Sequence, residues 1–424
     1  MLAIKKNIIF VFLASAFVGV GLSYGKIYAF HIAFAFALLF FPFRAAKSFI
    51  FTKPRFVFLF PALMVVYYMI SMLWAPHFLY AVTYVGYLLF GISIVYFTFF
   101  YIENLTQLNR LFLVLGMLLF VELIVSLLEI YTQFRYPISP YSKLVTHFGH
   151  GYKIDVNFSD KIKSLILSVP TGFHWNPNNL ATLLGIALPF TLLSANKWIK
   201  YIITLVLLLV LLATNSRGVV LSAALIIFYV FFIETVVSKR IFLFIVTLGI
   251  LIILLPQSIN PFNSVNKRIS DSVDAVFALF DDNQTSNSLG ARQELIKNAL
   301  DELDNHLWLG VGAGNSKFIQ EKNGKVAGKL TSLHNYWLEI LVDTGFIFFL
   351  VFVFWYFKVV YELVLISNTN TKLKYYSKSI YIAMLGLLIS AISCSSIVYF
   401  FPFWILLSIG LLVIRLNEKE QLAS

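Results

Sequence analysis

Charged residues are scarce in this chain, and cysteine is almost absent. Of the 424 residues, 12% are charged and 60% are hydrophobic. So few charged side chains cannot cover the surface of a soluble fold of this size, and the composition therefore excludes an ordinary soluble protein. The one cysteine, Cys394, excludes an intrachain disulfide and a thiolate metal cluster. Because Cys394 lies inside an apolar run, we interpret it as a packing residue.

The apolar residues form long continuous runs. The mean hydropathy is +0.85, and several runs exceed the roughly 18 residues that cross a bilayer as a helix. Membrane β-barrels show alternating segments of about ten residues instead, so the pattern predicts an all-α polytopic membrane protein. We expect about 12 transmembrane helices, at residues 7–24, 27–43, 56–75, 79–101, 111–131, 176–194, 201–214, 218–236, 241–256, 344–366, 378–398 and 400–416.

These spans divide the chain into three parts. Residues 1–256 hold the first nine predicted helices, with an outer loop at about 132–175. Residues 257–335 form a large hydrophilic loop, and residues 336–424 hold the last three predicted helices and a tail. A membrane protein gains nothing from a polar loop of this size that only connects two helices. We therefore expect the functional site to include this loop.

Lysine and arginine are unevenly distributed between the two ends of the predicted helices. Positively charged short connections remain in the cytoplasm. Alternate connections carry most of these residues: Lys5 and Lys6; Arg44, Lys47, Lys53 and Arg55; Arg110; Lys197 and Lys200; Lys239 and Arg240; Lys372, Lys374 and Lys378; Arg415 and Lys419. Both termini are therefore predicted to be cytoplasmic and the large loop to face outward. The net charge of +12 follows from this orientation, and its dispersal over separate loops argues against nucleic-acid binding.

Part of the large loop is predicted to be helical. Ser288 is placed to cap a helix from about 289 to 304. Its apolar stripe consists of Ile296, Ala299, Leu300 and Leu303. Arg292 lies four residues before Ile296, so we expect it on the same face. There it either reaches lipid phosphates or binds a substrate.

Alternating glycines follow this helix in the segment Leu309-Gly310-Val311-Gly312-Ala313-Gly314-Asn315. A dinucleotide loop needs a βαβ context that is missing here, so we reject nucleotide binding. Such glycines let the backbone pass close to a neighbouring helix or a ligand, or form a simple turn.

Arg217 is an exception to the charge pattern. It lies in the short outer turn Asn215-Ser216-Arg217-Gly218 between two apolar spans. Guanidinium groups match phosphate oxygens and remain charged. Arg217 and Arg292 are therefore candidates for binding a lipid-linked pyrophosphate, and the alternative for Arg217 is contact with lipid head groups.

Two further motifs stand at the outer ends of predicted spans. In Asn176-Pro177-Asn178-Asn179, the first residues suit a helix start, whereas Asn179 enters the apolar part and needs a partner. His334 opens the tenth hydrophobic stretch, and on a helix there Asn335, Glu339 and Asp343 form a polar stripe on a different face from His334. A neutral imidazole at this boundary accepts a proton from a hydroxyl group, or else it caps the helix or binds water.

Taken in order, these motifs resemble those of the O-antigen ligase and O-antigen polymerase superfamily. The resemblance rests on Asn176-Pro177-Asn178-Asn179, Asn215-Ser216-Arg217-Gly218, the Gly310 to Asn315 segment and the His334 to Gly345 segment. It implies a helical glycosyltransferase fold of the C type in the bacterial inner membrane, with the active site and the large loop in the periplasm. The donor would be a glycan on undecaprenyl pyrophosphate, held by Arg217 and Arg292, and His334 would activate or position the acceptor hydroxyl. Further substrate contacts are expected at Asn176, Asn178, Asn179, Ser216, Asn315, Asn335 and Glu339.

The expected reaction is an inverting transfer that needs neither metal nor cofactor. Undecaprenyl pyrophosphate leaves, and the arginines stabilise its growing charge. The outer segments contain no Asp-x-Asp pair, and the adjacent Asp281 and Asp282 are weak metal ligands. A polymerase would transfer the glycan to another lipid-linked repeat unit, and a ligase to lipid A-core. We favour the polymerase, because nothing in the sequence points to lipid A-core; other polysaccharide assembly proteins are further candidate partners.

Two functions of other classes stay open. A lipid-linked oligosaccharide flippase would place charged groups within its spans, and Glu122 and Glu129 of the fifth span fit that pattern. A noncatalytic scaffold for polysaccharide assembly would leave His334 and the arginines dispensable.

Overall fold

Helices make up most of the computed structural model, which describes residues 2–43, 55–154, 160–233, 288–323, 332–394 and 396–423. The longer ones are α1 (Leu2–Val18), α2 (Ala29–Leu39), α4 (Phe56–Ser71), α5 (Phe78–Tyr101), α6 (Leu105–Tyr131), α7 (Asp160–Leu167), α8 (Pro177–Leu192), α9 (Thr204–Ala213), α10 (Arg217–Phe228), α13 (Ser288–Asn305), α14 (Asn315–Asn323), α15 (Tyr336–Thr344), α16 (Phe346–Thr369), α17 (Lys374–Ser390) and α18 (Phe401–Ala423). Short helical turns are η1 (Gly19–Leu22), η2 (Lys143–Phe148), η3 (Ile199–Ile203) and η4 (Tyr229–Ile233). Strands β1 (Ser23–Tyr24) and β2 (Ile27–Tyr28) form an antiparallel hairpin, in which Ser23 pairs with Tyr28.

The predicted class, a helical membrane protein, is confirmed. A helix occupies each predicted span that the structure describes, whereas the ninth, 241–256, lies outside the described residues. In the described part, α5, α6, α16 and α18 are long and apolar enough to cross a bilayer, and several other helices are apolar but shorter. The total of about 12 spans stays a prediction.

Several other predicted features also fall outside the described residues. They are the aspartates Asp281 and Asp282, the basic residues Arg44, Lys47, Lys53, Lys239 and Arg240, and the side chains of Lys5, Lys6 and Arg292.

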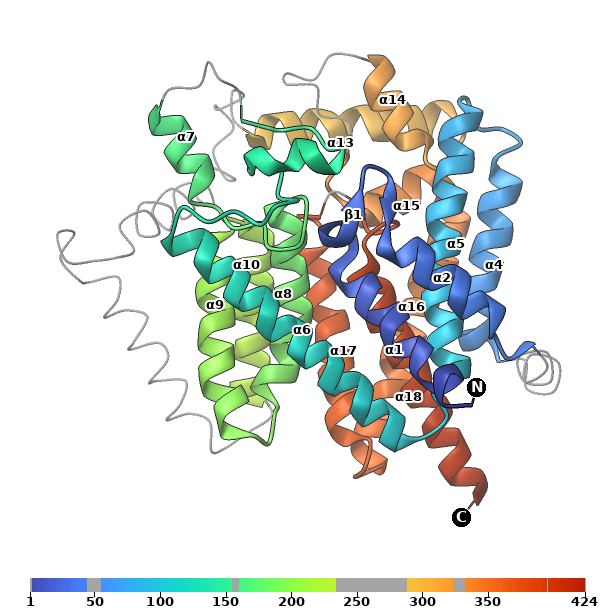
Figure 1. The fold of residues 1–424 in the computed structure, drawn as a ribbon. Helices are drawn as coiled ribbons and strands as arrows, with labels where there is room; N and C mark the ends of the chain where they lie inside the picture. The colour runs from blue at the N-terminus through green and yellow to red at the C-terminus, as the bar shows by residue number, and fades with distance from the viewer. Residues whose placement is uncertain are drawn as a thin grey trace.

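The two ends of the helical bundle differ in what covers them. Helices α13 and α14 lie across one end, and both chain termini lie toward the other (Figure 1). Which face is cytoplasmic stays a prediction from the charge pattern.

Helix α18 is the central helix of the bundle. In its most apolar 18-residue window 94% of the residues are buried, compared with 33% in α6 and 44% in α5. It packs along α5 and also contacts α1, α16 and α17. A Cβ at Gly91 of α5 would lie 2.3 Å from Trp404 of α18, so this close packing requires glycine.

The outer layer of α13, α14 and α15 has a small apolar core of its own. That core consists of Leu295, Ala299, Val311, Ile319, Leu333, Leu338 and Val342. In contrast, Tyr336 and Ile340 of α15 belong to the core of the bundle. Residues four apart share a helix face, so α15 joins the two cores by presenting one face to each.

The helix predicted from about 289 to 304 is confirmed as α13, but its buried stripe differs from the prediction. Leu295, Ala299 and Leu303 are buried, whereas Leu300 is 38% exposed. The buried face contacts α14 and α15, and Gln320 Nε2 of α14 donates to the Leu295 carbonyl at 3.0 Å. The predicted stripe was partly wrong because the position of these neighbours selects the buried face.

The predicted span 344–366 corresponds to α16, and one other helix boundary was predicted wrongly. The helix that precedes α16 ends at Gly345, where φ is +81° and a Cβ would lie 2.4 Å from the Leu309 carbonyl. This close approach separates α15 from α16. The predicted span 378–398 is too long, because α17 ends at Ser390.

Candidate functional site

The segment 391–400, which joins α17 to α18, is the point where the candidate motifs meet. It touches the start of α8, the start of α10 and the side of α15 through three pairs: Cys394 with Asn179, Ser393 with Gly218, and Ser396 with Glu339. Sequence reasoning missed this segment. Its serines and cysteine between two apolar runs were the available signal, but the predicted span 378–398 covered them.

The start of α8 combines a helix cap with one interior contact. Asn176 caps the helix, because its Oδ1 accepts the Asn178 N–H at 2.9 Å. Asn179 Oδ1 accepts a hydrogen bond from Cys394 Sγ at 3.2 Å. The expectation that Asn179 needs a partner is therefore confirmed. The interpretation of Cys394 as packing alone was incomplete, because its thiol also binds this amide.

The start of α10 places a cation at a helix N-terminus. Asn215 has a φ of +59°, and Arg217 is the first residue of the helix. Arg217 is exposed, whereas Ser216 is 2% exposed and its Oγ has no hydrogen-bond partner among the described residues. A Cβ at Gly218 would lie 2.5 Å from Ser393 Oγ. The positive end of a helix dipole and a guanidinium group at one helix start favour an anion.

His334 lies before α15 and not on its face. Its backbone has a φ of +46°, an uncommon conformation for a residue with a side chain. The helix begins at Tyr336 because Asn335 is its cap, accepting the Leu338 N–H at 3.3 Å. The predicted helical position of His334 was therefore wrong. The Tyr336 N–H donates to the Ala391 carbonyl at 3.2 Å, which fixes this helix start beside segment 391–400.

The predicted polar stripe of α15 is buried. Glu339 is 5% exposed and accepts a hydrogen bond from Ser396 Oγ at 2.8 Å. Asp343 is fully buried and accepts the N–H groups of Gly314 and Ser316, each at 2.9 Å. Both carboxyl groups lie in α15, before the apolar helix α16. Burial and, to a smaller extent, the neighbouring Asp343 carboxyl group raise the pKa of Glu339 to about 8. Burial also raises the pKa of Asp343 to about 7, although hydrogen bonds from Ser316 and Gly314 act in the opposite direction.

The glycine segment passes close to two helices, as one of its interpretations predicted. A Cβ at Gly312 would lie 2.8 Å from the Cβ of Ala75, and one at Gly314 would lie 2.3 Å from the Tyr84 ring. Asn315 is completely buried. Its Oδ1 accepts the His77 N–H at 2.8 Å and its Nδ2 donates to the Ala313 carbonyl at 2.9 Å. These contacts fasten the start of α14 to the α4–α5 turn.

His174 is a second histidine beside segment 391–400. It is 7% exposed, and burial lowers its pKa to about 4, so the imidazole is neutral at physiological pH. Its ring centroid lies 6.1 Å from that of Phe400, and its Nε2 has no hydrogen-bond partner among the described residues. The unsatisfied nitrogen makes His174 a candidate for a substrate contact.

Together these features define a class: a helical membrane protein with a polar site where α8, α10 and α15 begin. Comparison with known proteins identifies the relatives. The model of the family described as O-antigen ligase matches residues 202–353, a range that contains Arg217, Arg292 and His334. The chain is 24% identical over 396 residues to Teichuronic acid biosynthesis protein TuaE of Bacillus subtilis (strain 168). This match covers 86% of this chain and 72% of that relative.

The resemblance to the O-antigen ligase and polymerase superfamily is thus confirmed. The matches support a polymerase or ligase type of role in the assembly of surface polysaccharide. The motif at 176–179 lies outside the range that the family model matches.

Proposed function

We propose that this protein is an integral-membrane glycosyltransferase that polymerises glycan repeat units carried on undecaprenyl pyrophosphate. The proposed reaction takes place at the outer face of the bacterial inner membrane. The observation that carries the proposal is the convergence of the α8, α10 and α15 motifs on segment 391–400, in a chain that resembles O-antigen ligases. A lipid-linked donor and a sugar acceptor both require such a site at a membrane surface.

The donor pyrophosphate is assigned to the start of α10. Arg217 is exposed there, and the first N–H groups of the helix add positive potential. Arg292, on the outer helix α13, is the proposed second cation. Ser216 is a candidate hydrogen-bond donor to a phosphate oxygen because its hydroxyl has no partner among the described residues.

The asparagines divide into two groups. Asn176 and Asn335 cap helices, and Asn315 docks α14, so we assign these three structural roles. Asn178 and Asn179 are half-buried in the first turn of α8 and remain proposed sugar contacts. Glu339 is held by Ser396, and we assign it to the wall of the site.

The proposed chemistry is a single inverting displacement. The acceptor hydroxyl oxygen bonds to the anomeric carbon of the donor's reducing-end sugar. The bond from that carbon to the pyrophosphate oxygen breaks, and undecaprenyl pyrophosphate leaves with the electron pair. The hydroxyl proton passes to the His334 imidazole, and Arg217 and Arg292 offset the charge on the leaving group.

The test removes the proposed base and the proposed pyrophosphate ligand. We expect His334→Ala and Arg217→Ala to lower glycan transfer by about 10²-fold or more at unchanged protein level, as for loss of a general base or an oxyanion ligand. His147→Ala and Arg110→Ala are matched controls, because both side chains are exposed and neither residue belongs to a candidate motif. Polymer profiles like those of the wild type in both site variants would overturn the proposal.

The second candidate is an O-antigen ligase, favoured by the description of the matching family. Both enzymes need the same donor site and differ in the acceptor. A deletion strain separates them. Loss of a polymerase leaves core capped with a single repeat unit, whereas loss of a ligase leaves bare core and long lipid-linked polymer.

The transport hypothesis is less well supported. Its sequence basis was Glu122 and Glu129, and the carboxyl groups of both accept backbone N–H groups of residues 171–173. The noncatalytic scaffold predicts full activity in the His334 and Arg217 variants, so the same experiment tests it.

A further inference from the structure

Two buried carboxyl groups on α6 hold one short stretch of backbone. Glu122 and Glu129 are both fully buried. Glu129 Oε2 accepts the N–H groups of Thr171 at 2.7 Å and Gly172 at 2.9 Å. The Phe173 N–H donates to Glu122 Oε1 at 3.2 Å and to Oε2 at 3.3 Å. Three consecutive amides of a loop are thus bound by side chains from a single helix.

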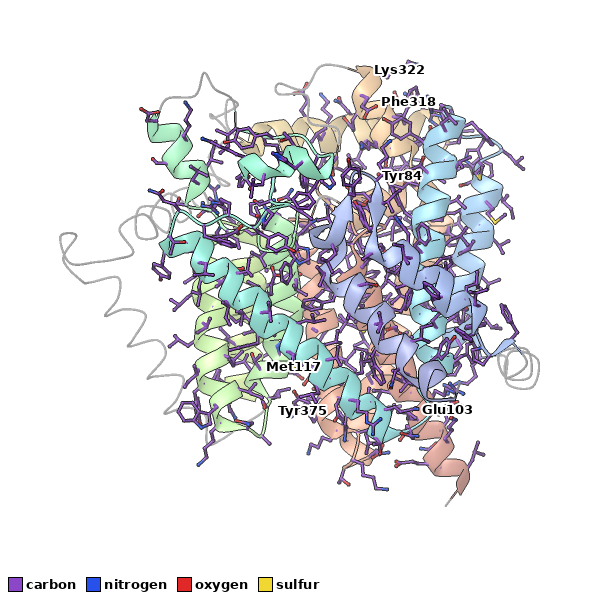
Figure 2. All side chains as sticks on the ribbon, viewed as in Figure 1. Tyr84, Glu103, Met117, Phe318, Lys322 and Tyr375 are labelled. Atoms are coloured by element: carbon purple, nitrogen blue, oxygen red, sulfur yellow. The ribbon has the colours of Figure 1, made fainter. Side chains whose placement is uncertain are left out.

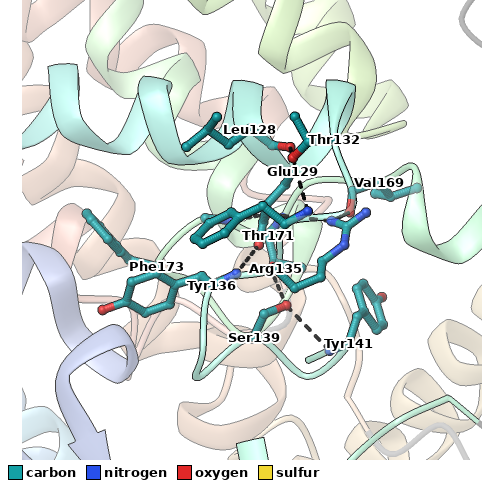
Figure 3. A network of polar contacts seen from close by, with 12 residues as sticks. Leu128, Glu129, Thr132, Arg135, Tyr136, Ser139, Tyr141, Val169, Thr171 and Phe173 are labelled. Carbon is teal, nitrogen blue, oxygen red and sulfur yellow. Dashed lines mark hydrogen bonds and ion pairs between the residues drawn. The ribbon is translucent and has the colours of Figure 1, made fainter. Parts of the chain in front are cut away.

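Glu129 also binds the chain that leaves α6 (Figure 3). Its Oε1 accepts the Tyr136 N–H at 3.1 Å, and its Oε2 lies 3.8 Å from Arg135 Nη1. The same Arg135 nitrogen donates to the Val169 carbonyl at 3.3 Å. The Arg135 side chain is only 7% exposed, so this ion pair is shielded from water. Glu129 therefore joins the end of α6 to the loop that precedes α8.

The loop fits closely against α6 and against the N-terminal part of the chain. Gly172 has a φ of +54°, and a Cβ there would lie 1.8 Å from Glu122 Oε1. On the other side, a Cβ at Gly21 would lie 2.7 Å from the Cβ of Phe173. Both glycines are needed for this approach, so residues 171–173 are held from two sides.

The residues that follow this fastened stretch belong to the candidate site. The His174 N–H donates to the Thr171 carbonyl at 2.9 Å, so the turn that carries His174 begins at a fastened residue. Next come Trp175 and Asn176, the cap of α8. The carboxyl groups of α6 therefore hold the stretch of backbone that leads into α8, the helix in which Asn179 meets Cys394.

We propose that Glu122 and Glu129 are positioning residues of the glycosyltransferase site. They fix residues 171–176 so that His174 and the start of α8 lie against segment 391–400. Neither carboxyl group contacts the substrate. This inference rests on the proposed function, because positioning has a catalytic consequence only if the site transfers glycan.

A series of substitutions at Glu129 tests the effect on catalysis. Glu129→Ala removes the acceptors of three N–H groups and should lower kcat by about 10²-fold, the cost of a displacement of about 1 Å at an active site. Glu129→Gln keeps an oxygen for Thr171 and Gly172 and should recover part of the rate, whereas the shorter Glu129→Asp should not. Glu103→Gln is the matched control, because Glu103 is exposed just before the opposite end of α6.

Amide hydrogen exchange gives a readout that does not depend on activity. In the full-length protein, exchange of the amides at 169–176 should be faster in Glu129→Ala than in the wild type and unchanged in Glu103→Gln. If Glu129→Ala does not accumulate, Glu129→Gln supports the inference by intermediate changes in exchange and rate.

The possible failures are distinguishable. Unchanged exchange in the Glu129 variants would overturn the fastening of the loop. Faster exchange with wild-type kcat and KM would overturn the positioning role. Full activity of the His334 and Arg217 variants would instead overturn the proposed function, whatever the Glu129 variants show.

Discussion

Asp343 links the start of α14 to α15, and its removal has a calculable cost. Its Oδ1 accepts the Ser316 N–H and its Oδ2 the Gly314 N–H, each at 2.9 Å, and the side chain is fully buried. Asp343→Ala leaves both donors without a partner. At about 1–3 kcal/mol for each unsatisfied buried group, docking of α14 should weaken by about 2–6 kcal/mol. Asp343→Asn keeps one acceptor oxygen, so it should cost about half as much.

Native-state proteolysis of α14 measures this loss of docking free energy. Trypsin cleaves after Lys317 of α14 only when the helix opens, so the cleavage rate at this residue follows the open population. A loss of about 2 kcal/mol corresponds to about 30-fold faster cleavage. The control is Asp301→Ala on the exposed side of α13, which should change the rate by less than about threefold. Equal rates in the wild type and Asp343→Ala would refute the assignment of Asp343 as the link.

Two other predictions concern the same layer. Because the folded-state pKa values of Glu339 (about 8) and Asp343 (about 7) lie above the ordinary values of 4.5 and 3.8, the folded state binds more protons. The stability of the folded state should therefore fall as pH rises from about 4 to about 8, which thermal unfolding of the purified protein measures. Glu339→Gln should make stability depend less on pH. A stability that rises over this pH range would contradict the burial of these groups. Gly312→Ala should weaken the docking of α14, because Gly312 has a φ of +88° and the new Cβ would lie 2.8 Å from the Cβ of Ala75. A cleavage rate by trypsin like that of the wild type would contradict this.

Helices were predictable because hydropathy and run length are properties of consecutive residues. The cap at Asn176 and the helix α13 were also predictable, since they depend on residues a few positions apart. The end of α17 was not, because the residues that follow Ser390 contact the distant helices α8, α10 and α15.

Candidate functional residues divided in the same way. Arg217 stands out in the sequence as an exception to the charge pattern, and His334 by its place at the start of a hydrophobic stretch. The proposed positioning role of Glu122 and Glu129 was not predictable, because their partners lie 51 and 42 residues further along the chain. A buried carboxyl group in a span looks the same in sequence whether it binds a transported ion or a loop amide.

The sequence by itself determined that this is a helical membrane protein and which polar residues are exceptional, because both follow from local composition. Only the tertiary structure decided how those residues are used. It placed His334 before its helix, buried the stripe of Glu339 and Asp343, and made segment 391–400 the meeting point of three helices. The physical reason is that a buried polar group must find a partner. Which partner lies within reach is set by the folding of the whole chain.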